Sequence, residues 1–385
     1  MGRAWRAVGG SPRAIVADAL IDEVLKATGR TSLGPESEYR APLDVIVKGL
    51  QHAPHLSTVG RMMVRRQIRG SLLQRAARAG WQERTPDRFQ TPLRTPLIIV
   101  GLPRTGTTFL HHLLAAAPDT RSLAMWEVAK PFPPLDGPDL RRSDNERAAN
   151  RVLASMPDFA TKHDTARDAP EECMHVMNLA FFTWTWWSAH NVPGYRDWLQ
   201  TADPRPAYRV WSDVLRFHQH TRPNQRFVLK SPSHSAYLDA LLEAAPEARV
   251  VFTHRDPRKV VPSFASLVHT LREATHTPDH LDPHALGRQV LDHLADTAER
   301  AKRLRAQIPA DRLVDVHFDD LRANPLAVAE RVHRAFGLDW TDTNRSAADT
   351  LVRTQAARKA SGHRYSAATY GLTDDAILAR IPSLA

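Results

Sequence analysis

The sequence predicts an α/β fold in which a mostly parallel sheet is flanked by helices. Three observations lead to this prediction. Short apolar runs alternate with helical patterns through the second half of the chain, a glycine-containing turn joins the first apolar run to a helix, and the first 90 residues are helical in pattern. The chain has 385 residues, 42% of them hydrophobic and 24% charged, which is enough apolar material to bury a sizeable core.

The first part of the chain, residues 1–90, is predicted to be an N-terminal helical region. Residues 14–27 are periodic in hydrophobicity, and residues 59–79 form a long amphipathic pattern rich in arginine. We expect these helices to pack against the core or to form a contact between subunits. Residues 91–139 then hold the first part of the core, which the chain enters through a proline-containing linker.

The stretch TPLIIVGLPRTGTTFLHHLLAAAP, residues 95–118, predicts a strand, a tight turn and a helix. Residues 97–100 are apolar or β-branched, as in a buried strand, and residues 109–117 have a helical pattern. Between them, Gly101 and Gly106 bracket four residues. This is the spacing of a P-loop, in which backbone N–H groups and a helix N-terminus surround a phosphate. The predicted fold is therefore of the P-loop type.

This loop departs from that of a nucleoside triphosphatase. Such enzymes carry a lysine followed by serine or threonine after the second glycine, whereas this chain has Thr107 and Thr108 there. The cation of the loop is instead Arg104, two residues before the second glycine. The loop can hold a phosphate, but it lacks the lysine of an ATP-hydrolysing site.

Residues 140–224 are predicted to form a helical insertion. Four of its residues have the spacing of one face of a single helix: Met177, Phe181, Trp184 and Ser188. This pattern fits a core helix, and it also fits the aromatic wall of a pocket for an apolar ligand.

The remaining core is predicted over residues 225–340, where strands and helices alternate. Strands are expected at 227–229, 249–253 and 313–317, and helices at 235–245, 257–271, 285–307 and 327–336. In a parallel sheet of this kind, ligands bind at the carboxyl ends of the strands, and both Arg104 and Arg255 follow predicted strand ends. Residues 341–385 are expected to form a C-terminal closing segment.

Two segments about 150 residues apart resemble a known family. GLPRTGTTFL, residues 101–110, resembles the phosphosulfate loop of sulfotransferases, which use 3′-phosphoadenosine 5′-phosphosulfate (PAPS). ARVVFTHRDPRKVVPSFASL, residues 248–267, resembles the segment of that family that holds the nucleotide 3′-phosphate. The segments WE, PEE and KSPSH around them are most similar to a bacterial branch of the P-loop sulfotransferase superfamily.

The resemblance implies an enzyme that transfers a sulfuryl group from PAPS, in line, to a hydroxyl of a moderately apolar small molecule. A natural product or a lipid-like alcohol or phenol would suit, the product nucleotide would be 3′-phosphoadenosine 5′-phosphate (PAP), and no metal is required. The residues carried over for the nucleotide are Arg104, Thr105, Gly106, Thr107, Thr108 and Phe109 in the loop, Arg255 and Ser263 at the 3′-phosphate, and Arg358, Lys359 and Gly362 in a closing segment.

The acceptor hydroxyl needs a general base. His234 is the first candidate, because it closely follows Lys230 at a predicted strand end and a neutral imidazole suits the role. Glu127 is the rival, since some branches of the family place a glutamate shortly after the loop helix. Three further residues remain open as the base: Glu171, Glu172 and His175. Lys230 itself is expected to contact the sulfuryl group or the leaving phosphate.

The acceptor pocket is expected to include aromatic and acidic side chains from the insertion and the segment before it. These residues are Trp126, Glu171, Glu172, Phe181 and Trp184.

Charge and cysteine content bear on the partners. The formal net charge of +10 suggests an anionic partner, and PAPS would satisfy it. Basic residues are scattered and no nucleic-acid motif is present, so no nucleic-acid partner is expected. Cys173 is the single cysteine, which excludes an internal disulfide and metal clusters held by cysteines.

No stretch approaches 18 uninterrupted apolar residues, so we expect a soluble cytoplasmic protein without stable membrane insertion. The extra N-terminal helices would suit a homodimer. Two other functions stay open at this point: a P-loop kinase-like nucleotide-dependent transferase, and a nucleic-acid-binding or scaffold protein with an inactive loop.

Overall fold

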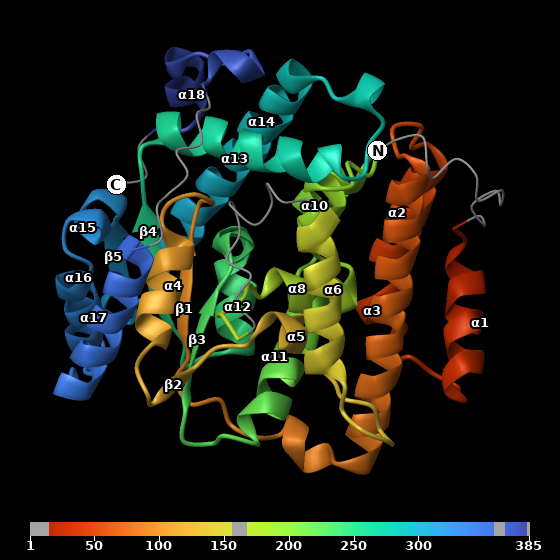
Figure 1. Ribbon diagram of the computed structural model, residues 1–385, viewed down its shortest axis with the longest axis horizontal. Helices are drawn as coiled ribbons and strands as arrows, with labels where there is room; N and C mark the ends of the chain where they lie inside the picture. The colour runs from red at the N-terminus through yellow and green to blue at the C-terminus, as the bar shows by residue number, and fades with distance from the viewer. Residues whose placement is uncertain (1–14, 156–167, 358–365, 383–385) are drawn as a thin grey trace.

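A central sheet of five strands organises the computed structural model, which describes residues 15–155, 168–357 and 366–382. The strands lie in the order β2-β3-β1-β4-β5, and each neighbouring pair is parallel (Figure 1). Their bounds are β1 Leu97–Gly101, β2 Thr120–Arg121, β3 Arg226–Lys230, β4 Arg249–His254 and β5 Leu313–His317. The predicted α/β fold with a mostly parallel sheet is confirmed.

Strand β1 is buried on both faces because its side chains alternate between two apolar clusters. Leu97 and Ile99 belong to one cluster, whereas Ile98 and Val100 belong to the other. The first face is covered by α4 (Thr107–Ala115), α16 (Pro325–Ala335) and α17 (Asp342–Ala357). The second is covered by α11 (Arg205–Gln219), α12 (Leu238–Ala244), α13 (Pro257–Glu273) and α14 (Pro283–Arg305).

The register of the sheet brings three strand ends to the same edge. Ile99 of β1 lies opposite Lys230, and Gly101 lies opposite Thr253 of β4. The residues that follow β1 therefore emerge between the ends of β3 and β4. This is the position where a doubly wound sheet binds its ligand.

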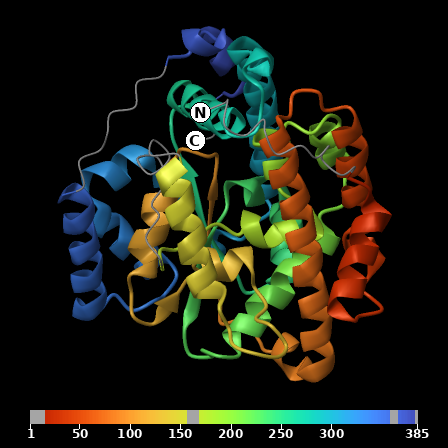
Figure 2. The same ribbon diagram turned by 45° about the vertical axis from the view of Figure 1, so that its right-hand side comes forward.

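Helices make up most of the described part of the N-terminal region, residues 15–90, and they pack against the core. Its helices are α1 (Ala17–Thr28), α2 (Arg40–Gln51) and α3 (Thr58–Arg84), which stand side by side in Figures 1 and 2. A buried ion cluster joins α3 to its surroundings. Arg75 donates to Glu38 at 2.8 Å, and Arg78 donates to Asp213 of α11 at 3.0 Å. Since the four charges are paired and hydrogen-bonded, their burial is tolerated.

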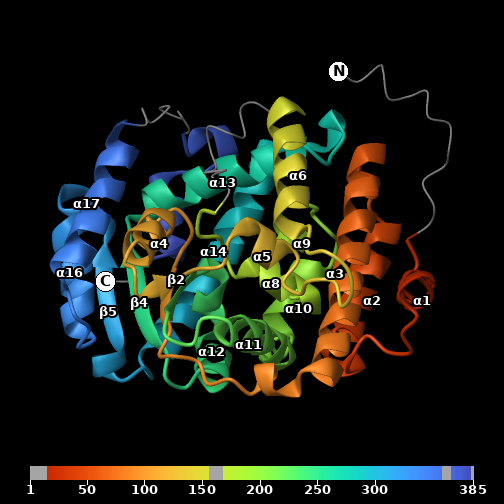
Figure 3. The ribbon, with the colours of Figure 1, turned by 60° about the horizontal axis from the view of Figure 1, so that its bottom comes forward.

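The segment after β2 is mostly helical. It contains α5 (Met125–Ala129), α6 (Arg141–Ser155), α8 (Met174–Met177), α9 (Thr185–Ser188) and α10 (Tyr195–Thr201), followed by α11. Figure 3 shows α6 standing between α4 and the N-terminal helices, as Figure 1 also does.

The single helix expected across residues 177–188 is wrong. The helical conformation ends at Phe181, whose φ of 54° lies in the left-handed region. The hydroxyl of Tyr195 satisfies the backbone at this break, because it donates to the carbonyl of Phe181 at 2.6 Å and accepts the N–H of Thr183 at 3.2 Å. A side chain from α10 thus replaces the helical hydrogen bonds that the break removes.

In the second half, the predicted strands and helices occur in the predicted order. The helix expected at 235–245 begins as a 3₁₀ turn over Pro232–Tyr237 and continues as α12. Two further short helices are α15 (Phe318–Ala323) and α18 (Asp374–Arg380). None of the helices described is both long enough and apolar enough to span a membrane.

Candidate active site

The loop between β1 and α4 has the backbone of an anion-binding turn. Gly101, Arg104 and Gly106 all have positive φ, at 128°, 68° and 89°. A Cβ on Gly101 would lie 2.3 Å from the hydroxyl of Thr253, and one on Gly106 would lie 3.0 Å from the ring of Phe318. Glycine is therefore required at Gly101. The left-handed Arg104 is a strained residue of the kind found at functional sites.

The first turn of α4 presents backbone N–H groups that have no partners within the helix, together with the positive end of its dipole. The hydroxyl of Thr105 is used to hold the loop, since it donates to the carbonyl of Leu102 at 2.6 Å and lies 2.6 Å from the hydroxyl of Thr253. Thr107 is buried and Thr108 is exposed. The loop is thus tied to β4 by the hydroxyl of Thr105.

The two segments that resemble a nucleotide site meet in space. Arg104 Nε donates to Ser263 Oγ at 3.1 Å, and Arg255 Nη1 donates to the carbonyl of Arg104, 151 residues away, at 2.8 Å. The guanidinium of Arg255 lies 3.9 Å from the centre of the Phe318 ring, which holds the cation in place. Asp256 caps the start of α13, because its carboxylate accepts the N–H of Arg258 at 2.9 Å.

A third cation comes from the end of β3. Lys230 has only 2% of its surface exposed, and its Nζ donates to Thr108 Oγ1 at 3.3 Å and to Glu172 Oε1. The N–H of Cys173 donates to the carbonyl of Lys230 at 3.0 Å, which anchors the segment carrying Glu172 to the strand end. Arg104, Arg255 and Lys230 therefore converge on one edge of the sheet.

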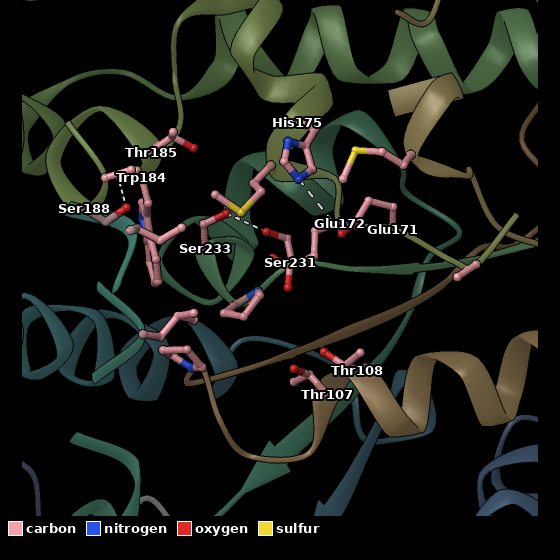
Figure 4. Close-up of a pocket in the computed structure, with 18 of the residues that line it drawn as sticks. Thr107, Thr108, Glu171, Glu172, His175, Trp184, Thr185, Ser188, Ser231 and Ser233 are labelled. Carbon is pink, nitrogen blue, oxygen red and sulfur yellow. Dashed lines mark hydrogen bonds and ion pairs between the residues drawn. The ribbon is translucent and has the colours of Figure 1, made fainter. Parts of the chain in front are cut away.

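A cavity of about 670 Å³ lies beside the loop (Figure 4). Its polar residues include Arg104, Thr107, Thr108, Glu171, Glu172, His175, Ser231 and Ser233. Its apolar residues include Met125, Met174, Trp184, Phe264, Leu267 and Leu271. The size and the mixture of apolar walls with a few polar groups are typical of a small-molecule site.

Several predicted site residues line this cavity: Arg104, Thr107, Thr108, Glu171, Glu172, His175 and Trp184. Ser231 and Ser233 were not predicted as site residues, but their hydroxyls lie 2.8 Å apart and line the cavity in Figure 4. They belong to the KSPSH segment at a strand end, so their position could have singled them out.

His234 does not line the cavity. Its ring is fully buried, with Nδ1 2.7 Å from the hydroxyl of Tyr208 and with the ring of Trp211 at 5.7 Å. Burial lowers the pKa of His234 to about 3, so the imidazole does not accept a proton near neutral pH. The geometry therefore does not favour His234 as the base.

Glu127 also lies outside the cavity lining, and its carboxylate is occupied. It accepts the N–H of Ala124 at 2.9 Å and a bond from Arg121 at 3.0 Å. These contacts close the first turn of α5, which is a structural role. Trp126 and Phe181 are not lining residues either. Trp126 packs under the guanidinium of Arg141. Phe181 is a fully buried core residue at the point where the helical conformation ends.

Two further expectations concern the nucleotide base and the closing segment. Phe109 is partly buried and packs against the cluster between the sheet and α16. Arg358, Lys359 and Gly362 lie outside the described residues. Among the described residues, no group of three or more His, Cys, Asp or Glu side chains is placed to hold a metal ion.

Comparison with known proteins agrees with this geometry. The model of the sulfotransferase family matches residues 96–342. Two solved structures resemble the chain over nearly its whole length. Sulfotransferase STF1 from Mycobacterium tuberculosis H37Rv is 28% identical, with a TM-score of 0.80, over 97% of this chain and 100% of that one. Sulfotransferase STF9 from Mycobacterium avium is 26% identical, with a TM-score of 0.86, over 96% of each.

The curated relatives that match are named omega-hydroxy-beta-dihydromenaquinone-9 sulfotransferase Stf3, from Mycobacterium bovis and Mycobacterium tuberculosis. Each is 26% identical over an alignment of 263 residues, and the alignment covers 63% of this chain. The chain spans 63% of the length of these relatives.

Proposed function

This chain belongs to the sulfotransferase family, and from that premise we propose that it is a sulfotransferase whose donor is PAPS and whose acceptor is an apolar small molecule with a hydroxyl group. The observation behind the proposal is a pair of hydrogen bonds: Arg104 donates to Ser263, and Arg255 donates to the carbonyl of Arg104. A nucleotide with phosphates at both ends of its ribose needs two anion sites close together. Arg104 and Arg255 supply a cation for each.

The residues present fit such a donor. The N–H groups of Thr105 to Thr108 suit the 5′-phosphate, at a helix N-terminus and in a left-handed turn. Arg255 and Ser263 suit the 3′-phosphate. PAPS would supply the activated sulfuryl group, and the residues of this chain would bind and orient it.

The chemistry requires stabilisation of negative charge. Sulfuryl transfer develops charge on the equatorial and leaving oxygens, as phosphoryl transfer does, so donors aimed at those oxygens lower the barrier. Arg104 lines the cavity at the loop and can make a two-point contact with such oxygens. Lys230 is held at hydrogen-bond distance from Thr108 and supplies a second positive charge there.

The acceptor is proposed to be apolar because of the cavity wall away from the loop. Met125, Met174 and Trp184 line it, together with the three apolar residues of α13. A compound with a hydroxyl at one end and an apolar body would place the hydroxyl near Glu172 and the body along this wall. The name of the curated relatives, which specifies a hydroxylated dihydromenaquinone, supports a lipid-like acceptor.

Location and assembly remain expectations from the sequence. We propose a cytoplasmic enzyme, because the single cysteine, Cys173, is buried and no internal disulfide can form. A homodimer is proposed on the basis of the extra N-terminal helices.

Calorimetric titration tests the donor. The purified protein is titrated with PAP and, separately, with ADP, both without magnesium. We expect PAP to bind at least about tenfold more tightly, because hydrogen bonds to a charged group contribute about 1.5–3 kcal/mol each and ADP lacks the 3′-phosphate.

Arg255→Ala supplies the matched control for this titration. It should weaken PAP binding and leave ADP binding unchanged. Equal binding of PAP and ADP to the unmodified protein would contradict the proposed 3′-phosphate site and favour a kinase-like transferase.

A further inference from the structure

We propose that Glu172 is the general base that takes the proton of the acceptor hydroxyl, an assignment that rests on the function proposed above. Glu172 lines the cavity, and its carboxylate is paired with Lys230 at the end of β3. The acidic and histidine side chains that line the cavity are Glu146, Glu171, Glu172 and His175, and of these Glu172 contacts the lysine that reaches the phosphate-binding loop. The other candidates are placed differently.

The connection runs through one lysine. Lys230 Nζ contacts Glu172 Oε1 on one side and Thr108 Oγ1, in the first turn of α4, on the other. An acceptor hydroxyl bound to the carboxylate would therefore lie next to the loop that holds the donor phosphate. This is the arrangement an in-line transfer needs, since the base must reach the nucleophile while the cation serves the leaving group.

Glu172 is also held firmly in this place. The next residue, Cys173, donates its N–H to the Lys230 carbonyl, and the N–H of Glu172 itself donates to Glu171 Oε1 at 2.9 Å. The Glu172 side chain is 22% exposed, so it is open to the cavity, whereas the Lys230 side chain is 3% exposed. The carboxylate can therefore meet an acceptor without moving the backbone.

The neighbouring candidates lack this geometry. Glu171 Oε1 accepts the backbone N–H of Glu172 and lies 4.0 Å from His175 Nε2, which makes it a positioning residue for both. His175 is on the outer wall, with 36% of its side chain exposed, and Figure 4 shows it on the far side of the two glutamates from Thr107 and Thr108.

The proton balance of the step is simple. The acceptor O–H bond breaks and its proton goes to a carboxylate oxygen of Glu172. The electron pair of that bond forms the new bond from the acceptor oxygen to sulfur, while the bond from sulfur to the phosphate oxygen breaks. The negative charge that leaves with the phosphate stays next to Lys230 and Arg104, and solvent removes the proton from Glu172 after the product departs.

Glu172→Gln tests the assignment, because the amide keeps the size of the side chain and an oxygen for Lys230 but is not a base. The assay uses PAPS with a series from 4-ethylphenol to 4-octylphenol, and it also follows release of PAP when water is the acceptor. We expect kcat to fall about 10²–10⁴-fold and the acid limb of the pH profile of kcat to disappear. PAP affinity, measured by calorimetry, should stay within about threefold or increase, because Lys230 loses its anionic partner.

Glu171→Gln and His175→Gln are the matched controls. Each replaces an ionisable side chain near Glu172; kcat falls where positioning is lost, but each variant should keep the acid limb of the pH profile of kcat, which a positioning role does not move. Lys230, the cation that is paired with Glu172, is left intact in all three variants.

The outcomes separate this inference from the proposed function. If Glu172→Gln keeps kcat and its pH profile while the unmodified enzyme transfers from PAPS, or if a control variant abolishes the acid limb instead, the assignment of Glu172 is overturned and the function stands. If the unmodified enzyme fails to bind PAP, or binds it without transferring to any phenol or to water, the proposed function fails and this assignment fails with it.

Discussion

Arg104 combines a cavity-lining guanidinium with a left-handed backbone, and both follow from its place in the loop. The φ of 68° lets successive N–H groups point to one side, and the side chain then reaches across to Ser263 of α13. The carbonyl of the same residue accepts Arg255. A single residue thus joins the two proposed phosphate sites. Because its contact with Ser263 is made by the side chain and its contact with Arg255 by the carbonyl, removing the side chain leaves the backbone contact in place.

Arg104→Ala is expected to lower kcat/KM for PAPS about 10²–10³-fold, the usual effect of removing one donor that stabilises developing charge. The melting temperature should change little, because the arginine is exposed and alanine adopts the same left-handed backbone at similar strain. Kinetics and thermal unfolding of the same preparation check this. Arg104→Lys is the informative control, since it keeps the positive charge but loses the two-point hydrogen bonding of the guanidinium group.

At the scale of elements, the break between α8 and α9 shapes the cavity. Because the chain turns at Phe181, Trp184 reaches the cavity while Phe181 enters the core. The indole of Trp184 also borders a smaller void, too narrow to admit water, which lies between it and Tyr237. The ring of His293 packs 4.4 Å from Trp184 and 4.1 Å from Trp187, which holds the wall in place.

Trp184→Ala should therefore join the cavity to this void and favour longer acceptors. We expect the ratio of kcat/KM for 4-octylphenol to that for 4-ethylphenol to rise about tenfold or more, since each additional buried methylene contributes about 0.8 kcal/mol. Trp187→Ala is the matched control, because it removes an equally buried indole that does not line the cavity. An unchanged ratio in Trp184→Ala, or an equal rise in both variants, would contradict this role.

At the scale of the whole molecule, buried neutral histidines link stability to pH. Burial lowers the pKa of five of them to about 3 or 4: His190, His218, His234, His276 and His293. In the unfolded chain these groups titrate near 6.5, so between about pH 3 and 6.5 the unfolded state binds more protons than the folded state. Stability therefore rises with pH in this window and is lost as the pH falls below about 6.5.

Urea unfolding at pH 7.0, 6.0 and 5.0 measures this dependence. Each histidine that stays neutral in the fold lowers the free energy of unfolding by up to about 1.4 kcal/mol per pH unit below 6.5. We expect a loss of several kcal/mol between pH 7 and pH 5. His293→Gln should reduce the slope, whereas His175→Gln, at a partly exposed position, should not. A free energy of unfolding that is flat over this range would show that the buried histidines titrate normally.

The sheet itself explains why the sequence predicted so much of the fold. Alternating burial on β1, the positive-φ loop and the parallel strands all follow from local spacing, and the predicted strands at 227–229, 249–253 and 313–317 lie within β3, β4 and β5. The helix predicted over 177–188 failed because its hydrogen bonds are replaced by Tyr195, a residue of another element. Periodicity carries no information about such a partner.

The sequence by itself determined the family, the α/β fold and the loop residues, because a turn that surrounds a phosphate needs particular residues at fixed spacing along the chain. Only the tertiary structure decided which side chains meet the cavity. His234 follows a strand end as Lys230 does, yet Tyr208 and Trp211 of α11 enclose it and keep it neutral. Glu172 is placed beside Lys230, 58 residues later in the chain. Burial and charge depend on neighbours in space, and these are assembled only when the distant segments pack.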